Sequence, residues 1–515
     1  MKRDGACESL WQSIPAYDER PYPYIKDASF DVIIVGAGIT GITTALLLQR
    51  AGKKCLLAEA HNIGFGTTGG TTAHINTLLD TPYSTISKNF GEKDAQLIAD
   101  GTQQAVALIK SNISDYAIEC EFEDHDAYLF AQEDKQNDEL QTIVEATNKV
   151  GIQMNYADET PVPVPFTKAA VVNGQASFHP AKYIYALARA FEQAGGVIMQ
   201  QCRVTKVEKD EPLTITTSLG TVHATDIIYA THIPPGVNLL HFRCAPYRSY
   251  AIAVTLSDEN YPNELAYDMY DPYHYYRTQV IDGKKYLIAG GEDHKTAHEE
   301  NTLMCFDKLE AYLRKFYNIK EVAFKWSSQY FEPADGIPYI GQLPGHPDHQ
   351  YVATGFGGNG ITFGTLSAII LRDILTNKEN PLQEIFDPNR IKPVAGFANF
   401  VKESADVVGI LAKSVFPAEK LDELADLAYD EARVVKYEGS SLAIYKDIQG
   451  GIHAVNPDCT HISCSVAWNS AEKSWDCPCH GSRFSYDGEM LTGPARKDLE
   501  MTDLAVLLQD EAGEK

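Results

Sequence analysis

The sequence has no long apolar run and no excess of basic residues. None of its apolar stretches approaches the roughly 20 residues that an α-helix needs to cross a bilayer, so we expect no membrane span. It carries 70 acidic against 44 basic side chains, a formal net charge of -26. This charge disfavours nucleic acid and anionic membrane surfaces as partners. Residues 1–10 lack the apolar core of a signal peptide, so we expect a cytoplasmic protein.

Cysteine is too sparse for a secreted disulfide scaffold, with ten in 515 residues. Six of the ten are scattered along the first 305 residues and are expected to be small core residues. The remaining four crowd into one short window near the C-terminus and predict a metal site; they are Cys459, Cys464, Cys477 and Cys479. Internal repeats and low-complexity segments are also lacking.

A chain of 515 residues is too long for one core and predicts two to four domains of roughly 100–200 residues each. Residues 1–30 form an arm rich in Pro and Tyr. Residues 31–385 combine an α/β domain with an antiparallel-sheet α+β domain, in which residues from about 90 to 150 are predicted helical and residues 246–291 are predicted strands. Residues 386–427 predict a helical connector, and residues 428–515 predict a small all-β domain.

The α/β domain opens with a motif that predicts a nucleotide-containing cofactor. A β-branched strand over residues 30–35 leads into Gly36, Gly38 and Gly41, spaced G-x-G-x-x-G, and into a helix over about residues 39–51. In this Rossmann-like context the first glycine permits a tight turn, the second lets a pyrophosphate approach, and the third lets helix and strand pack closely. Glu59 ends the next strand, where its carboxylate can accept hydrogen bonds from ribose hydroxyls.

Two further segments favour flavin over nicotinamide. The first is a Gly/Thr-rich loop over residues 64–74 that can wrap a long cofactor; it contains Thr67, Thr68 and His74. The second is a glycine cluster before a helix; it contains Gly357, Gly358, Gly360 and Ile361. A separate NAD site there is disfavoured, because no strand ending in an acid follows the helix. Instead, the positive end of this helix can stabilise the anionic reduced flavin.

With these motifs, residues 31–385 resemble the D-amino-acid-oxidase, glycine-oxidase and sarcosine-oxidase family of FAD enzymes. The segments that match, besides the two glycine clusters, are residues 203–207, 229–231 and 335–341. The resemblance implies FAD, bound by about residues 31–80, 165–235 and 326–385, with Val204 at the adenine and Gly336 beside the cofactor. It also implies a substrate domain at about residues 81–164 and 236–325, and hydride transfer from an amine-bearing carbon to flavin N5.

In this family the antiparallel sheet covers one face of the flavin, which implies where substrate binds. An arginine there could hold a substrate carboxylate with two hydrogen bonds. Side chains on the predicted strands are therefore candidates: Tyr247, Arg248, Tyr250, His274, Tyr276 and Arg277. His74 matches the position of the flavin-linked histidine of dimethylglycine-dehydrogenase-like relatives, and both a covalent link and simple packing stay open.

The C-terminal cysteine window contains a second motif, C-x-H followed by C-x-x-H. A Rieske centre binds one iron by two thiolates and the other by two imidazoles, which would be Cys459 and Cys477 for the first and His461 and His480 for the second. Zinc also accepts two Cys and two His. Zinc fingers, however, pair Cys with Cys and His with His, so the interleaved spacing favours the [2Fe–2S] cluster.

This segment resembles the Rieske proteins of cytochrome bc complexes. The resemblance implies a disulfide between Cys464 and Cys479, a third cluster loop at residues 493–495, and imidazole edges that reach the surface. Ser482 matches the family pattern. Phe484 departs from it, because the high-potential members have a tyrosine there that donates a hydrogen bond to a ligand sulfur.

The combined motifs indicate an FAD-dependent enzyme that oxidises an amine or amino acid and passes electrons to the cluster and then to an external acceptor. Three other enzyme types stay open: an O2-using oxidase with a structural Rieske domain, a reductase fed by NAD(P)H, and a Rieske oxygenase. The reductase is disfavoured by the lack of a second nucleotide-binding fold. The oxygenase needs a mononuclear iron site, for which Asp293, His294 and His298 are the nearest candidates. A non-enzymatic electron-transfer or redox-sensing protein is a further alternative.

Overall fold

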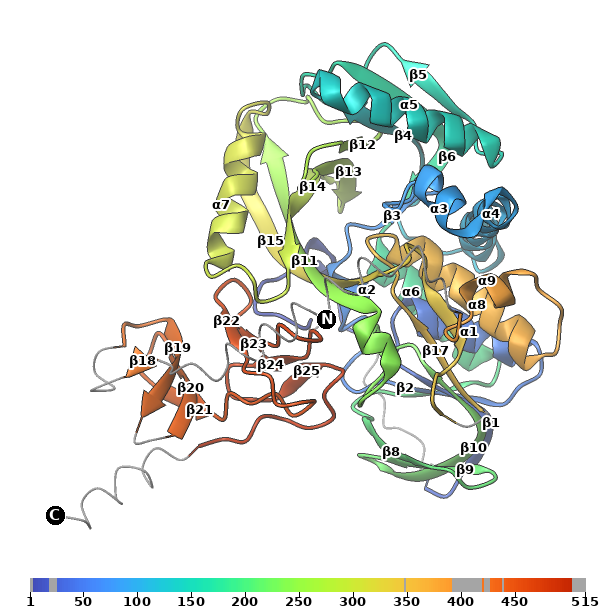
Figure 1. Cartoon of the computed structure of the whole chain (residues 1–515), viewed down its shortest axis with the longest axis vertical. Helices are drawn as coiled ribbons and strands as arrows, with labels where there is room; N and C mark the ends of the chain where they lie inside the picture. The colour runs from blue at the N-terminus through green and yellow to red at the C-terminus, as the bar shows by residue number, and fades with distance from the viewer. Residues whose placement is uncertain are drawn as a thin grey trace.

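The computed structural model describes residues 3–17, 26–346, 349–390, 419–420, 427–437 and 440–502. Most of the expected connector at residues 386–427 lies outside these ranges. Figure 1 shows two large sheets, one above the other, with a small all-β domain to one side. In the described part of the chain, no helix combines the length and the apolar character of a membrane span.

The first sheet is mostly parallel and forms the α/β domain. Its strand β1 (Ser29–Val35) is the buried β-branched run that the sequence predicts. The strand order is β16-β17-β10-β1-β2-β7, with β16 antiparallel and a β8–β9 ribbon on β10. The other strands are β2 (Cys55–Ala58), β7 (Val197–Met199), β8 (Val204–Glu208), β9 (Leu213–Thr217), β10 (Gly220–Tyr229), β16 (Tyr339–Gln342) and β17 (Gln350–Thr354).

Helices cover the first sheet on the side that carries the main core. Their apolar residues pack on Val32, Ile34 and Leu57 in one continuous cluster. The helices are α1 (Ile39–Arg50), α4 (Glu92–Asp115), α6 (Pro180–Gln193), α8 (Gly360–Leu375) and α9 (Leu382–Phe386). Because the strands are parallel, β1, β10 and β17 all end at one edge, and the loops that follow them meet there.

The second sheet has nine strands and is mostly antiparallel. Its order is β15-β11-β14-β13-β12-β4-β6-β3, with β5 paired to β6. The strands are β3 (His74–Ile75), β4 (Glu123–Ala131), β5 (Met154–Ala157), β6 (Lys168–Ser177), β11 (Cys244–Leu256), β12 (Leu265–Asp268), β13 (Tyr275–Ile281), β14 (Lys284–Lys295) and β15 (Ile319–Pro333). Shorter elements beside these sheets are α2 (Thr67–Gly70), α3 (Tyr83–Phe90), α5 (Asp134–Lys149), α7 (Thr302–Leu313), η1 (Leu10–Ser13) and η2 (Leu239–Phe242).

Strand β4 corrects the prediction that residues from about 90 to 150 are all helical. Helices α4 and α5 are present, but Glu123–Ala131 between them pairs with β6 on one side and β12 on the other. The acidic start of this segment hides its strand character. Pairing with two partners that are distant in sequence overrides the local preference, as is common for strands.

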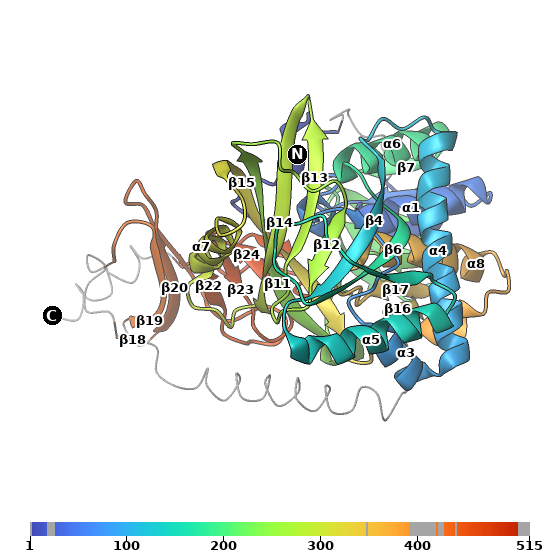
Figure 2. The same ribbon diagram turned by 90° about the horizontal axis from the view of Figure 1, so that it is seen from above.

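The C-terminal region is the small all-β domain that the sequence predicts, and it holds two four-stranded sheets. Figures 1 and 2 both place it beside β11, β15 and α7. Thr302 at the start of α7 donates a hydrogen bond to Asn469 of this domain at 2.9 Å. Its strands are β18 (Glu419–Lys420), β19 (Glu431–Tyr437), β20 (Ser440–Lys446), β21 (Ile452–Val455), β22 (Ala467–Asn469), β23 (Ser474–Asp476), β24 (Arg483–Ser485) and β25 (Met490–Thr492).

Buried ion pairs join the all-β domain to the rest of the chain. Arg3 of the arm contacts Glu472 at 2.8 Å, and Arg483 contacts Asp4 at 2.8 Å. Arg248 of β11 reaches Asp476 at 3.3 Å, and Asp476 also pairs with Arg483 at 3.1 Å. We call these six residues the junction network: Arg3, Asp4, Arg248, Glu472, Asp476 and Arg483. All six are buried, so the arm is an internal part of the junction between the domains.

Candidate active site and metal centre

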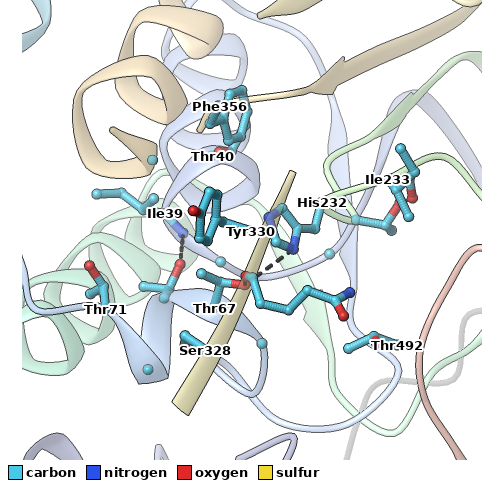
Figure 3. A pocket seen from close by; sticks show the side chains of 18 of the residues that line it. Ile39, Thr40, Thr67, Thr71, His232, Ile233, Ser328, Tyr330, Phe356 and Thr492 are labelled. Atoms are coloured by element: carbon cyan, nitrogen blue, oxygen red, sulfur yellow. Dashed lines mark hydrogen bonds between the residues drawn. The ribbon is translucent and has the colours of Figure 1, made fainter. Parts of the chain in front are cut away.

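A cavity of about 310 Å³ opens where the first sheet ends and the second sheet begins. Its lining comes from the first glycine motif, the Gly/Thr-rich loop, the second sheet and the all-β domain. Figure 3 shows Thr67, His232 and Tyr330 around this space, with Thr492 of the all-β domain at its side. The cavity therefore brings together both regions in which the sequence predicts chemistry.

The first glycine motif has the backbone geometry that a bound pyrophosphate needs. Gly36 has φ of +103°, and a Cβ there would lie 2.5 Å from the Ala230 carbonyl oxygen. A Cβ on Gly41 would lie 1.8 Å from the Gly36 carbonyl oxygen, so helix α1 approaches β1 too closely for any side chain. Gly38 caps α1, and the helix N-terminus faces the cavity, where backbone N–H groups can bind an anion.

Glu59 lies at the end of β2, and the backbone holds its side chain in place. Its carboxylate accepts hydrogen bonds from the backbone N–H groups of Ala37 at 2.7 Å and His61 at 2.9 Å. Burial raises the pKa of Glu59, while these two hydrogen bonds oppose the rise. The carboxylate lines the cavity, and its oxygens have further lone pairs that ribose hydroxyls could use.

Most of the residues expected at the cofactor do line this cavity. They are Gly36, Gly38, Glu59, Thr67, Thr68, His74, Val204, Gly357, Gly358, Gly360 and Ile361. Two of the expected residues do not. Gly41 lies behind the first turn of α1, and Gly336 packs against Thr81, whose Cγ2 would be 2.7 Å from an added Cβ.

The structure places none of the six substrate candidates named from the sequence in the lining of the cavity. Arg248 belongs to the junction network, and Tyr250 bonds His294 at 2.9 Å. His274 pairs with Asp268 at 2.8 Å, and Arg277 donates to the carbonyls of Thr72 and Ala73. The remaining two, Tyr247 and Tyr276, also lie outside the lining.

For Arg248, Tyr250 and Tyr276, the position outside the lining follows from the two-residue period of a strand. Arg277 lies on the same side of β13 as Tyr275, but the Thr72 and Ala73 carbonyls hold it behind the wall. On β11, Ser249 faces the cavity, so its neighbours Arg248 and Tyr250 face the other side. On β13, Tyr275 faces the cavity and Tyr276 does not. The alternation was visible in the sequence, but its phase depends on which side of the sheet meets the cofactor domain.

Tyrosines and two carboxylates line the end of the cavity under the second sheet. Asp293 accepts a hydrogen bond from the Tyr330 hydroxyl at 2.9 Å, and its other oxygen, Oδ1, is buried without a partner. Asp80 accepts one from the Gly358 N–H at 2.8 Å. Burial raises the pKa of Asp293 to about 7 and that of Asp80 to about 6. Other side chains here are Ser249, Tyr267, Tyr273 and Tyr275.

His74 lies beside these tyrosines, in the cavity wall. Its Nδ1 is 2.5 Å from the Tyr267 hydroxyl, and its Nε2 is buried without a partner. Burial lowers the pKa of this imidazole well below its usual value, so it is neutral. An unpartnered ring nitrogen in the wall fits a cofactor that supplies the missing contact, and it leaves both the covalent and the packing interpretations open.

The metal centre lies in the all-β domain, where two loops bring four predicted ligands together. The Cys459 and Cys477 side chains hydrogen-bond each other, and the His461 and His480 rings lie 5.0 Å apart. His461 Nδ1 and both ring nitrogens of His480 are buried without a partner. Buried polar atoms without partners are costly, and iron bound by the two imidazoles would satisfy one nitrogen of each ring. The residues therefore fit a [2Fe–2S] cluster.

A disulfide ties the two ligand loops together, as the resemblance implied. Cys464 and Cys479 are bonded with an S–S distance of 2.02 Å. These sulfurs and the Cys477 sulfur lie within 4.8 Å of one another. Among the described residues, they form the single cluster of three or more side chains of metal-binding type. Because a disulfide has no thiolate to offer, Cys477 alone of that trio can bind iron.

One of the two ligand histidines is buried, contrary to expectation: His480 is 1% exposed, whereas His461 is partly exposed. His461 Nε2 donates to the Gly236 carbonyl at 3.2 Å, which leaves Nδ1 free to bind iron. The ring of His241 packs 4.7 Å from His461 and 5.7 Å from His480, and Phe242 packs 5.4 Å from His480. The segment 236–242 belongs to the part of the chain that forms the two large sheets, so this part packs directly against the imidazoles of the all-β domain.

The residues considered for a mononuclear iron site do not form one. Asp293 lines the cavity, whereas His294 is held by Tyr250 and by the Lys295 carbonyl at 2.7 Å. Within the described residues, no cluster of potential metal ligands includes Asp293, His294 or His298. The oxygenase hypothesis therefore has no support in this geometry.

Comparisons with known proteins agree with both sites. The family model described as FAD dependent oxidoreductase, the D-amino-acid-oxidase type, matches residues 31–374, and the Rieske [2Fe-2S] domain model matches residues 418–503. The chain belongs to this oxidoreductase family and carries a C-terminal Rieske domain. It is therefore an FAD-dependent oxidoreductase with a [2Fe–2S] cluster.

Individual relatives share one or both modules. YhfW of Bacillus subtilis, named for a Rieske 2Fe-2S iron-sulfur protein, is 34% identical over 504 residues, covering 97% of this chain and 98% of its own. Gamma-glutamylputrescine oxidoreductase of Escherichia coli is 24% identical over 389 residues, covering 71% and 88%. The crystal structure of glycine oxidase from Geobacillus kaustophilus superposes with a TM-score of 0.60 at 17% identity, covering 70% and 99%, and shows the shared fold.

Two residues beside the cluster are expected to set its reduction potential in opposite directions. The Ser482 hydroxyl hydrogen-bonds the Cys459 sulfur, whereas Phe484 is buried in the same core and offers no donor. A hydrogen bond to sulfur stabilises the more negative reduced cluster. Phe484→Tyr should therefore raise the potential, and Ser482→Ala should lower it, in an EPR-monitored redox titration.

Tyr486, an exposed residue just after β24, provides the control for this titration. Tyr486→Phe removes a hydroxyl without touching the cluster core and should leave the potential unchanged. A potential that stays the same or falls in Phe484→Tyr would contradict the role assigned to position 484.

Proposed function

We propose that this protein is a dehydrogenase for amines or amino acids, which passes electrons from FAD to the Rieske cluster of the same chain and then to an external one-electron acceptor. The oxidation removes a hydride from a carbon and a proton from the attached nitrogen, so that a CH–NH group becomes an imine. FAD, when bound, accepts the hydride. The chain's own residues bind and orient the substrate and keep water away.

One observation carries the proposal: the Rieske domain forms part of the wall of the flavin cavity. Met490, Leu491, Thr492, Gly493, Ala495 and Arg496 all line it. Arg496 donates to the Pro235 carbonyl at 3.0 Å, and the Pro494 carbonyl accepts from the Gly236 N–H at 2.8 Å. A domain with a merely structural role would not need to place its cluster loops at the cofactor.

The segment from residue 232 to 242 connects the two sites within the chain. His232 and Ile233 line the cavity. His241 Nε2 donates to the Pro234 carbonyl at 2.9 Å, and the same ring packs on both ligand histidines. This short covalent and hydrogen-bonded connection supports electron transfer inside one chain, in preference to transfer between molecules.

Anaerobic single-turnover kinetics test this proposal. On mixing with an amine or amino-acid substrate, the flavin absorbance should bleach first, and the cluster signal should follow. The rate of the second phase should not depend on protein concentration, because both centres lie in one chain. A second phase whose rate rises in proportion to protein concentration, or a cluster that stays oxidised, would contradict the proposal.

A further inference from the structure

The substrate end of the cavity is acidic and aromatic. Two carboxylates, Asp80 and Asp293, lie there among the tyrosine side chains. The charge of Asp80 helps to raise the pKa of Asp293, because the two carboxylates repel each other when both are ionised. Both also raise the pKa of the Tyr273 hydroxyl. We call this part of the cavity the acidic end; its residues are Asp80, Asp293, Tyr267, Tyr273, Tyr275 and Tyr330.

Cations in the described part of the cavity wall lie elsewhere. The lining contains two, Arg203 and Arg496. Arg203 interacts with Glu59 and approaches His61, and Arg496 contacts Pro235, so both lie toward the expected nucleotide end. Neither reaches the acidic end through any contact that the structure shows.

Two histidines of the cavity wall, His74 and His232, are neutral. His274, behind the wall, is charged and pairs with Asp268. Burial lowers the pKa of His74 well below its usual value and that of His232 to about 4. His274 is protonated, since its hydrogen bonds and charge pairing with Asp268 and Glu292 outweigh burial and raise its pKa to about 9. It lies outside the lining and bonds Asp268 at 2.8 Å, although its charge partly offsets the burial of Asp293. Arg277 acts on the Tyr267 hydroxyl in the same way from behind the wall, where it donates to the Thr72 and Ala73 carbonyls.

We propose that the acidic end binds a positively charged amine that carries no carboxylate beside its nitrogen, and that it rejects α-amino acids. This inference rests on the proposed function, since it takes the cavity to be the substrate site. The buried, unpartnered Oδ1 of Asp293 accepts a hydrogen bond from the ammonium, and the ammonium favours the ionised form of this carboxyl group, whose pKa burial raises to about 7. Asp80, with a pKa of about 6, adds negative charge. The tyrosine faces add cation–π attraction.

The same residues disfavour a carboxylate. A substrate carboxylate at this end would face the Asp80 and Asp293 carboxyl groups, because both guanidinium groups of the lining, Arg203 and Arg496, lie toward the nucleotide end. Its oxygens could accept hydrogen bonds from the tyrosine hydroxyls, but these bonds are weaker than a two-bond arginine contact. An enzyme that selects amino acids by their carboxylate needs such a cation at the reacting end.

Binding measurements with three small molecules of matched length test this proposal on the whole FAD-loaded protein. The probes are butylammonium, butan-1-ol and butanoate, and the readout is the shift or bleaching of the flavin absorbance under anaerobic conditions. Because like charges repel and opposite charges attract strongly in a desolvated pocket, butylammonium should bind at least about tenfold more tightly than butanoate, with butan-1-ol in between.

Variants then assign the preference to the acidic end. Asp293→Asn and Asp80→Asn keep the size of the side chain and remove its charge. Each substitution should weaken butylammonium binding by about tenfold, which is at the low end of the affinity loss expected when one member of a buried charge pair is removed. Each should also strengthen butanoate binding. Asp258→Asn, on an exposed turn, is the control and should change neither affinity.

Two results would overturn the inference. One is butanoate binding as tightly as butylammonium to the wild-type protein. The other is the absence of any flavin response to butylammonium while FAD is fully bound. Neither result bears on whether the flavin reduces the cluster. That step is measured separately, by reducing the flavin with light in the absence of dithionite and following the cluster signal. Failure of this inference is therefore distinguishable from failure of the proposed function.

Discussion

Replacing His461 with alanine is expected to abolish turnover with a one-electron acceptor while leaving flavin reduction by substrate nearly intact. His461 is one of the two imidazole ligands, and the second iron cannot be held by His480 alone. The cluster should therefore be lost. Because the substrate end of the cavity lies on the second sheet and not on the Rieske loops, the flavin should still bleach at a rate within a few-fold of the wild type.

The measurement needs three readouts on the same preparation: iron content, anaerobic flavin bleaching, and steady-state reduction of the acceptor. His453→Ala is a matched control, because His453 belongs to the same domain and pairs with Asp447 at 3.0 Å, away from the ligands. It should retain both iron and turnover. Normal turnover of His461→Ala, with O2 consumed and peroxide released, would favour the oxidase hypothesis and refute transfer through the cluster.

The second large effect concerns the junction network. Replacing Arg483 with methionine should lower the free energy of unfolding by about 3–5 kcal/mol, the usual cost of breaking a buried ion pair by removing one partner. Arg483 contacts Asp4 at 2.8 Å and Asp476 at 3.1 Å, and all three side chains are buried. The variant leaves Asp4 without its 2.8 Å partner and deprives Asp476 of one of its two arginines.

Urea unfolding, followed separately by tryptophan fluorescence and by cluster absorbance, measures this effect and shows whether the modules unfold together. Arg433→Met is the control, because Arg433 lies on the surface of the same domain, where ion pairs contribute about 0–1 kcal/mol. Arg483→Met leaves two arginines against three carboxylates in the junction network, and Asp4 keeps only its 3.0 Å contact with Arg3. Adding Asp4→Ala should restore part of the loss, since it balances the buried charges again. Equal effects of Arg483→Met and Arg433→Met would contradict the assignment.

Motifs with short, fixed spacing could be predicted from the sequence. Gly36, Gly38 and Glu59 lie at the cavity, and the four cluster ligands come together, because each set depends on a local turn or loop. The residues of the second sheet that line the cavity could not be predicted. Ser249 and Tyr275 face the cavity, while their neighbours Arg248 and Tyr276 do not, and the phase of each strand is set by packing between the two sheets.

Residues that act across domains were also beyond sequence reasoning. Asp80 lies on a loop that no motif marks, and its carboxylate is held at the cavity by the Gly358 N–H, in the turn before α8 and far along the chain. Likewise, nothing in the sequence pairs Arg3 with Glu472, which are 469 positions apart. The contact of residues 236–242 with the ligand histidines depends on the same docking of domains, which explains why His480 is buried although the Rieske resemblance implies an imidazole edge at the surface.

The buried arm has a consequence for how the protein is assembled in time. Residues 3–11 are synthesised long before Glu472 and Arg483, with which Arg3 and Asp4 pair. Until those residues are made, Arg3 and Asp4 have only each other as partners in the junction network. Completion of the junction therefore reports that the last module has folded, and a bulky tag fused ahead of residue 3 should interfere with this final step more than one placed after residue 502.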